Sequence, residues 1–296
     1  MEKRTHRRKV VLILLAVALL LGGIYFATRS GTDPEVYSND FNVYYFAARE
    51  VAAGRDPYQN SLGSWTTYLY PPLMAEILVP LALLPLPVAA YIWFLISAAS
   101  VAAAARMSAS LAITDEQGSH SKLLLAAVAA LVLIARFILD NLNLGQVNNI
   151  VAALAVAHVY LYAKQKKLAS AAALALAVSI KLTPGVLLLY QIARLRLKFA
   201  VLCVSLIAVV TVASLLPYGQ RAPGVIEAFI DRTIMNEQGF DLAYSGNQSL
   251  RGALLRLGTD SDNNPVSAIS MVLAFLILAL SMMAARRGRT EIAAAA

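Results

Sequence analysis

The sequence is poor in charged residues and almost free of cysteine. Charged residues make up 14% of the 296 residues, against about 25% in ordinary soluble domains. Apolar residues reach 59% and the mean hydropathy is +0.65, so a water-soluble globular fold is excluded. The single cysteine, Cys203, lies in an apolar run, which excludes a disulfide framework and a cysteine-based metal site. His, Asp and Glu form no cluster with metal-ligand spacing, so we expect no metal and no cofactor.

The basic residues are unevenly placed along the chain. The 25 Lys and Arg residues give a net charge of +8. They gather in short runs between apolar spans, at residues 3–9, 164–167, 194–198 and 286–289. Such runs are typical of the cytoplasmic ends of membrane helices. We therefore expect these charges to meet membrane lipids, and we expect no nucleic-acid partner.

Four uncharged spans are long enough to cross a bilayer, which needs roughly 20 helical residues. They are residues 10–27, 88–105, 199–216 and 266–285. The first span follows a basic stretch and is either a secretory signal or an anchor, and the lack of a clean cleavage pattern favours the anchor. Shorter apolar runs alternate with polar clusters, which a membrane tolerates only where protein or water surrounds them. We predict an all-α, multispanning integral membrane protein.

Counting crossings from a cytoplasmic N-terminus gives a topology. We expect residues 1–296 to form a single polytopic domain of the cell membrane, with extracytoplasmic loops at 28–69 and 217–265. The polar clusters at 140–149 and 181–184 then fall on the same outer face. The same count makes the proline-rich stretch 71–87 a partial or re-entrant segment.

The first external loop is predicted to contain a short amphipathic helix within residues 38–50. Ser38 or Asp40 can cap its start and Gly54 can end it, and its aromatic residues suit the headgroup level. Asp40 has two interpretations: a helix cap, or a carboxylate at the membrane surface that accepts a proton from a substrate hydroxyl. Composition alone leaves both open.

Polar residues also interrupt the later apolar runs. The amides at 141–149 either cap the next helix, through Asn143 or Asn148, or bind a ligand. Lys181 lies between two half-length apolar runs that predict a short hairpin, and it either reaches lipid phosphate or holds an anion in a cavity. His158 lies alone in an apolar run and is expected to make a hydrogen bond between helices.

Six motifs occur in an order that resembles glycosyltransferase family 87, the membrane mannosyltransferases that use polyprenyl-phosphate mannose. They are Asp40-Phe41 with Tyr44-Tyr45, Gly54 with Asp56-Pro57-Tyr58, Tyr70-Pro71-Pro72, Gly145-Gln146-Val147-Asn148, Lys181-Leu182-Thr183-Pro184, and Asn247-Gln248-Ser249-Leu250.

This resemblance implies a GT-C-type fold with extracytoplasmic loop helices and an outward-facing active site. It implies an inverting transfer of a hexose, mannose in this family, from a polyprenyl-phosphate donor to a glycolipid or glycan acceptor. Asp40 would be the catalytic base. The expected phosphate ligands are Lys181, Arg49 and Arg251. The expected hydrogen-bond partners of the sugar or phosphate are Gln146, Asn148, Asn247 and Gln248. The tyrosines expected to line the path of the lipid or sugar are Tyr44, Tyr45 and Tyr70.

The chain departs from the family after Leu250, where other members continue for several crossings. It is therefore expected to be short at its C-terminal end. Two alternatives stay open: a non-catalytic or truncated member that binds lipid-linked sugar, and a lipid or sugar transporter. Transporter sites tend to have paired interruptions in two similar halves, and the sequence has no such symmetry.

Overall fold

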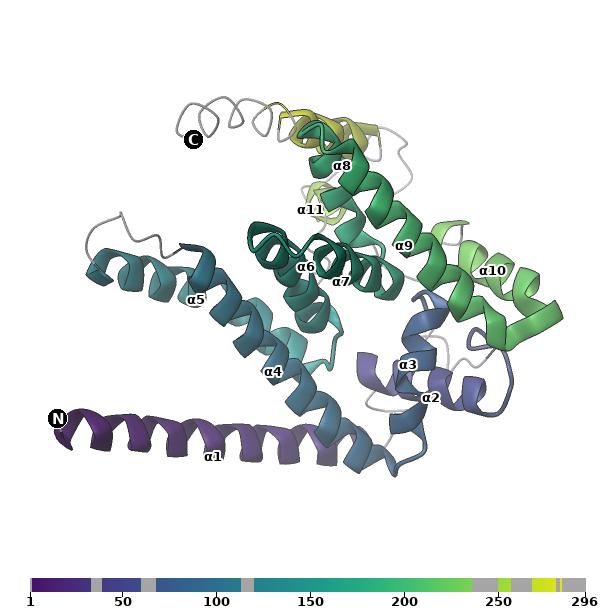
Figure 1. Ribbon diagram of the computed structural model, residues 1–296. Coiled ribbons are helices and arrows are strands. Elements are labelled where there is room, and N and C mark those ends of the chain that lie inside the picture. The colour runs from purple at the N-terminus through teal and green to yellow at the C-terminus, as the bar shows by residue number, and fades with distance from the viewer. Residues whose placement is uncertain are drawn as a thin grey trace.

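The computed structural model describes residues 2–32, 39–59, 68–112, 120–235, 250–256, 268–280 and 283, and these residues form helices and turns without a β-strand. The α-helices are α1 (Glu2–Thr32), α2 (Asp40–Ala52), α3 (Pro72–Ala82), α4 (Leu86–Ala112), α5 (His120–Asn143), α6 (Asn148–Ala163), α7 (Lys167–Ile180), α8 (Val186–Ala193), α9 (Leu197–Leu215), α10 (Ala222–Ile230) and α11 (Leu250–Arg256). Short turns of other helix types are η1 (Thr183–Gly185), η2 (Leu216–Arg221) and η3 (Asp231–Met235). Figure 1 shows their arrangement.

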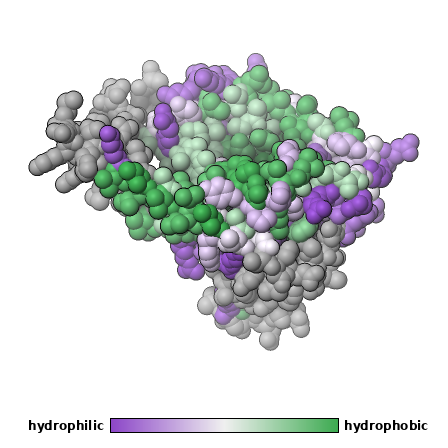
Figure 2. Space-filling view, turned by 90° about the horizontal axis from the view of Figure 1, so that it is seen from below, coloured by the Kyte–Doolittle hydropathy of each residue, from purple (hydrophilic) through white to green (hydrophobic). Residues whose placement is uncertain are grey.

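Two helical stretches among the described residues are long and apolar enough to cross a membrane, Leu86–Leu111 and Leu197–Thr233. They contain the predicted spans 88–105 and 199–216. The span 10–27 lies within α1, and residues 268–280 of the fourth span are helical. Many large apolar side chains on these helices are exposed, and Figure 2 shows them covering much of one face. The all-α prediction is confirmed for the described residues, and the exposed apolar helices fit a membrane protein.

The amphipathic helix of the first loop is confirmed as α2, but its cap was assigned to the wrong residue. The Asn39 side chain accepts a hydrogen bond from the Asn42 backbone N–H at 2.8 Å, and Asp40 is the first helical residue. Ser38 lies outside the described residues. The helix ends before Gly54, whose positive φ of 70° is readily adopted only by glycine. The carboxylate of Asp40 is therefore not needed as a cap.

The aromatic residues of α2 are buried within the protein. Phe41 and Tyr44 are fully buried and Tyr45 is 5% exposed. They pack against α3 and α4, where Trp93 stacks on Phe41 with ring centroids 5.6 Å apart. These rings therefore pack against protein rather than projecting from the helix surface, and their level relative to the headgroups stays a prediction.

The predicted hairpin at Lys181 is confirmed as α7, η1 and α8. The buried His158 of α6 contacts both arms: its Nδ1 lies 3.0 Å from the Ser170 carbonyl oxygen, and its Nε2 lies 3.1 Å from Gln191 Nε2. Ser170 is near the start of α7 and Gln191 near the end of α8. His158 thus makes hydrogen bonds between helices, as predicted.

Four polar segments far apart in the sequence meet at one end of the helical assembly. The Asp40 N–H donates to the Leu144 carbonyl at 2.9 Å, and Lys181 Nζ donates to Asn148 Oδ1 at 2.7 Å. The Thr233 hydroxyl donates to the Leu69 carbonyl at 3.2 Å. In Figure 1, α2, α3 and α10 gather at this end, on the right of the view, while the N-terminus lies at the left. The segments predicted to share one face therefore lie together.

Candidate active site

A cavity of about 390 Å³ opens where these segments meet. Its wall is built by Asp40 and Val43 from α2, residues 69–71 from the turn before α3, residues 181–183 from the hairpin tip, and Phe229 and Thr233 from α10 and η3. Asp40 and Lys181 thus place opposite charges in one cavity otherwise lined largely by apolar groups. Its volume lies within the range of small-molecule sites, about 300–1,000 Å³.

Asp40 is one of the lining residues of the cavity. Its backbone N–H is held by the Leu144 carbonyl, so the start of α2 is tied to the 140–149 loop. Burial raises the pKa of its carboxyl group, while a hydrogen bond from the Gln146 side chain and the charge of Lys181 partly offset this. A carboxylate of raised pKa is a stronger base than one in water, and it stays ionised well above that pKa.

A chain of hydrogen bonds joins Lys181 to Asp40. Lys181 Nζ donates to Asn148 Oδ1, and Asn148 Nδ2 donates to Gln146 Oε1, each at 2.7 Å. Gln146 in turn bonds the Asp40 carboxylate. Asn148 Nδ2 also donates to Asn141 Oδ1 at 2.7 Å. Every amide accepts on the lysine side and donates on the aspartate side, so the network fixes the orientation of both ends.

These contacts bear on two questions left open by the sequence: whether the amides at 141–149 cap a helix or bind a ligand, and whether Lys181 reaches lipid phosphate or holds an anion in a cavity. Helix α6 begins at Asn148 and has no side-chain cap, because its N-cap position is Val147. The capping interpretation of Asn148 is therefore wrong, and Asn143 instead accepts from Arg29 Nη1 at 3.2 Å. Lys181 lines the cavity, and besides its bond to Asn148 its ammonium lies 5.6 Å from the centroid of the Tyr70 ring, a position that fits the interpretation as an anion ligand.

Two hydrogen-bonded tyrosines lie beside these charges. The Tyr44 hydroxyl donates to the Tyr70 hydroxyl at 2.9 Å, and the rings meet edge to face with centroids 4.9 Å apart. Burial raises the pKa of Tyr70 to about 12, and the charge of Asp40 adds to the increase. Tyr70 therefore stays neutral near pH 7 and keeps a hydroxyl for hydrogen bonding. Of the two, only Tyr70 lines the cavity.

The loop carrying the amides is fixed by Gly145. Its φ is 66°, and a Cβ at this position would lie 2.7 Å from Phe26 Cζ and 2.8 Å from Phe41 Cβ. The Gly145 carbonyl accepts a hydrogen bond from Trp93 Nε1 at 2.8 Å. Only glycine allows this close approach of the loop to α1 and α2, which brings Gln146 to Asp40.

Several predicted residues lie elsewhere. Tyr45 turns away from the cavity, because its hydroxyl donates to the Leu84 carbonyl at 2.7 Å between α3 and α4. Arg49 is exposed near the end of α2 and does not line the cavity. Asn247 and Gln248, like the side chain of Arg251, lie outside the described part of the chain.

Sequence reasoning missed the contribution of α10. Phe229 and Thr233 line the cavity, although nothing in their sequence neighbourhood distinguishes them from other loop residues. Leu182 and Thr183 also line it, and the motif around Lys181 was the available signal for them. Within the described residues, no three His, Cys, Asp or Glu side chains are grouped to hold a metal ion.

Two curated proteins are similar to this chain. The chain is 28% identical over 287 residues to a polyprenol-phosphate-mannose-dependent alpha-(1-2)-phosphatidylinositol pentamannoside mannosyltransferase of Mycobacterium tuberculosis, covering 93% of this chain and 63% of that protein. It is 29% identical over 267 residues to the corresponding phosphatidylinositol mannoside mannosyltransferase of Mycolicibacterium smegmatis, covering 85% of this chain and 59% of that protein. The chain thus spans about three fifths of the length of these curated relatives. No solved structure is significantly similar to it.

The family model of glycosyltransferase family 87 matches residues 68–296. The match contains Tyr70, Gln146, Asn148 and Lys181, while Asp40 lies ahead of it. It covers well over half of the chain. The protein therefore belongs to glycosyltransferase family 87.

Proposed function

We propose that the protein transfers mannose from a polyprenyl-phosphate donor to a hydroxyl group of a glycolipid acceptor. Both relatives are named for a polyprenol-phosphate-mannose donor and a phosphatidylinositol mannoside acceptor. The single observation that carries the proposal is the pairing of Asp40 and Lys181 across one cavity, joined by Asn148 and Gln146.

The chemistry needs one base and one cation. In an inverting transfer the acceptor oxygen attacks C1 of the sugar as the bond from C1 to the phosphate oxygen breaks on the opposite face. The proton of the acceptor hydroxyl passes to the Asp40 carboxylate, and the departing lipid phosphate keeps the electron pair. Phosphate is a good leaving group, so a second carboxylate that protonates it, as in glycosidases, is not required.

Lys181 would stabilise the negative charge of the leaving phosphate. An ammonium in the wall of a partly enclosed cavity binds a phosphate oxygen by a charge-assisted hydrogen bond. Its hydrogen bond to Asn148 keeps the ammonium directed into the cavity, and Tyr70 lies beneath it. The polyprenyl chain would lie along the exposed apolar helices, and the transfer would take place on the extracytoplasmic face.

Transfer is tested by incubating membranes that contain the protein with radiolabelled polyprenyl-phosphate mannose and extracted glycolipids. Labelled glycolipid is expected from the wild-type protein and not from membranes lacking it. Binding of the donor without any transfer would instead support a non-catalytic member of the family.

Sidedness is tested separately in intact cells with a Thr183→Cys variant on a Cys203→Ser background. Thr183 is exposed and lines the cavity, whereas Cys203 is fully buried. A membrane-impermeant maleimide added outside should label the new thiol. Labelling only after the membrane is opened would place the cavity on the cytoplasmic side.

A further inference from the structure

A second cavity, of about 420 Å³, lies beside the first. Its polar lining comes from the end of the first predicted external loop, with Asp56 and Gln59, and from the start of the second, with Gln220 and Arg221. The Arg221 guanidinium donates to the Gly54 carbonyl, so the two loops are joined at its rim. None of these side chains takes part in the active site described above.

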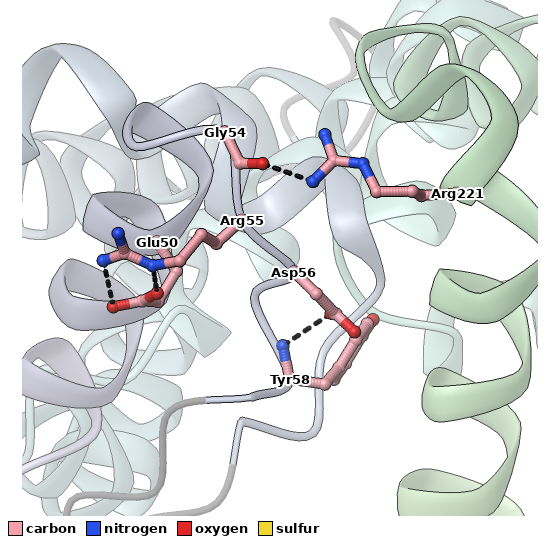
Figure 3. Close-up of polar contacts among 6 residues, drawn as sticks. All are labelled: Glu50, Gly54, Arg55, Asp56, Tyr58 and Arg221. Carbon is pink, nitrogen blue, oxygen red and sulfur yellow. Dashed lines mark hydrogen bonds and ion pairs between the residues drawn. The ribbon is translucent and has the colours of Figure 1, made fainter.

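The charges of this cavity are nearly balanced. Arg55 also lines it, but its guanidinium is turned toward Glu50, with Nη2 donating to Oε1 at 3.1 Å, and away from Arg221 (Figure 3). Asp56 Oδ1 accepts from the Tyr58 backbone N–H at 2.9 Å, which leaves lone pairs on its second oxygen. The charged and amide groups offered to a ligand are thus one guanidinium, one carboxylate and two side-chain amides, and the mostly buried Tyr218 also lines the cavity.

This set of groups selects a class of ligand. A guanidinium only donates hydrogen bonds, an ionised carboxylate only accepts them, and an amide does both. A ligand that satisfies them together must carry donors and acceptors side by side, as the hydroxyl groups of a sugar or polyol do. A bare phosphate offers acceptors only and would meet the like charge of Asp56.

The second cavity adjoins the first along α10. Val225 lines the second cavity and Phe229 the first, four residues or about 6 Å further along the helix. The buried Tyr58 packs behind the lining of the first cavity: its ring centroid lies 6.2 Å from that of Phe229, and its hydroxyl donates to the Tyr70 carbonyl at 2.7 Å. A ligand of more than one ring could reach from one cavity toward the other.

We propose that the second cavity binds the hydroxyl-rich headgroup of the acceptor and directs one of its hydroxyl groups toward Asp40. The identification of the ligand as the acceptor rests on the proposed transfer reaction. The binding of a hydroxylated ring in the second cavity is independent of that reaction. Asp56, Gln59, Gln220 and Arg221 would make the hydrogen bonds.

Binding is measured by saturation-transfer NMR on the full chain in nanodiscs, with methyl α-D-mannopyranoside as the probe and inorganic phosphate as a second probe. Arg221→Ala is compared with Arg106→Ala, an exposed arginine outside both cavities. Since Arg221→Ala also removes the contact to Gly54, a double variant, Gln59→Ala with Gln220→Ala, truncates two exposed side chains instead. We expect the mannoside to bind the wild type and Arg106→Ala equally, and the other variants roughly tenfold more weakly.

Three results would overturn the inference: no binding of the mannoside to the wild-type protein, binding lost in Lys181→Ala but kept in the double variant, or binding of phosphate alone. Where the wild type transfers mannose, the double variant should raise the acceptor KM and leave the donor KM unchanged. Binding of the mannoside without any transfer would support the second cavity while refuting the proposed function.

Discussion

Replacing Asp40 by Asn removes the base and leaves the fold in place. The cap of α2 is Asn39, and the contact of residue 40 with Leu144 is made by its backbone. The new amide keeps an oxygen that can accept the hydrogen bond from Gln146. The loss of an acidic residue in the first helical turn lowers stability by only about 0.3–1 kcal/mol.

The expected loss of activity is far larger. A positioned general base contributes ~10² to 10⁴-fold to a rate, so the mannosyl transfer rate of Asp40→Asn should fall by that factor. The assay is the single-turnover transfer of radiolabelled mannose in membranes, with thermal unfolding in detergent measured in parallel. Asp140→Asn is the matched control, because that carboxylate is exposed and its ion-pair contact with Arg136 is long, at 3.7 Å. A transfer rate of Asp40→Asn equal to the wild-type rate would remove Asp40 from the mechanism.

Three further results are expected. Lys181→Ala should raise the donor KM roughly tenfold or more, since hydrogen bonds to charged groups contribute about 1.5–3 kcal/mol. Lys164→Ala is the control and should leave the donor KM unchanged, because Lys164 is exposed at a turn outside the cavity. A lower kcat with an unchanged donor KM in Lys181→Ala would contradict this role. The transfer rate should be constant near neutral pH and fall as the pH drops through the raised pKa of Asp40, because only the ionised carboxylate accepts the proton. A transfer rate that instead rises on acidification would exclude a carboxylate base. Gly145→Ala should lower the thermal unfolding midpoint, because a Cβ there overlaps Phe26 and Phe41. Gly185→Ala is the control and should leave the midpoint unchanged, because nothing lies within 4 Å of its added Cβ. Equal midpoints for the two variants would contradict the close packing of the loop.

The helices and the meeting of the polar segments could be predicted from sequence because both follow from the lipid environment, which offers no hydrogen bonds to the backbone or to polar side chains. Long uncharged runs must be helical in lipid, and polar clusters between them must find protein or water. Asp40, Gln146, Asn148 and Lys181 were therefore recognisable as a group before any geometry was known. The described contacts join all four.

The direction of individual side chains could not be predicted in this way. Tyr44 and Tyr45 are neighbours in sequence, yet one hydroxyl bonds Tyr70 and the other bonds the Leu84 carbonyl. Which of them approaches the cavity depends on how α2 packs on α3 and α4, and both rings have the same preference for burial. The helix cap was likewise missed: the sequence analysis offered Ser38 or Asp40, whereas Asn39 is the cap, and all three residue types cap helices well.

The contribution of α10 is a tertiary effect. Phe229 and Thr233 lie about 190 residues beyond Asp40 and reach the cavity only because η2 and α10 fold back over the first loop. Arg221 bonding the Gly54 carbonyl and Thr233 bonding the Leu69 carbonyl record that contact. Neither Phe229 nor Thr233 belongs to a pattern that hydropathy or spacing reveals.

The central claim is tested most directly by an experimental structure of the protein in a lipid nanodisc with polyprenyl-phosphate mannose bound. The donor phosphate is expected within about 2.7–2.9 Å of Lys181 Nζ, with C1 of the sugar beside the Asp40 carboxylate and the cavity open to the extracytoplasmic side. A donor bound outside this cavity, or Asp40 and Lys181 facing separate cavities, would contradict the account.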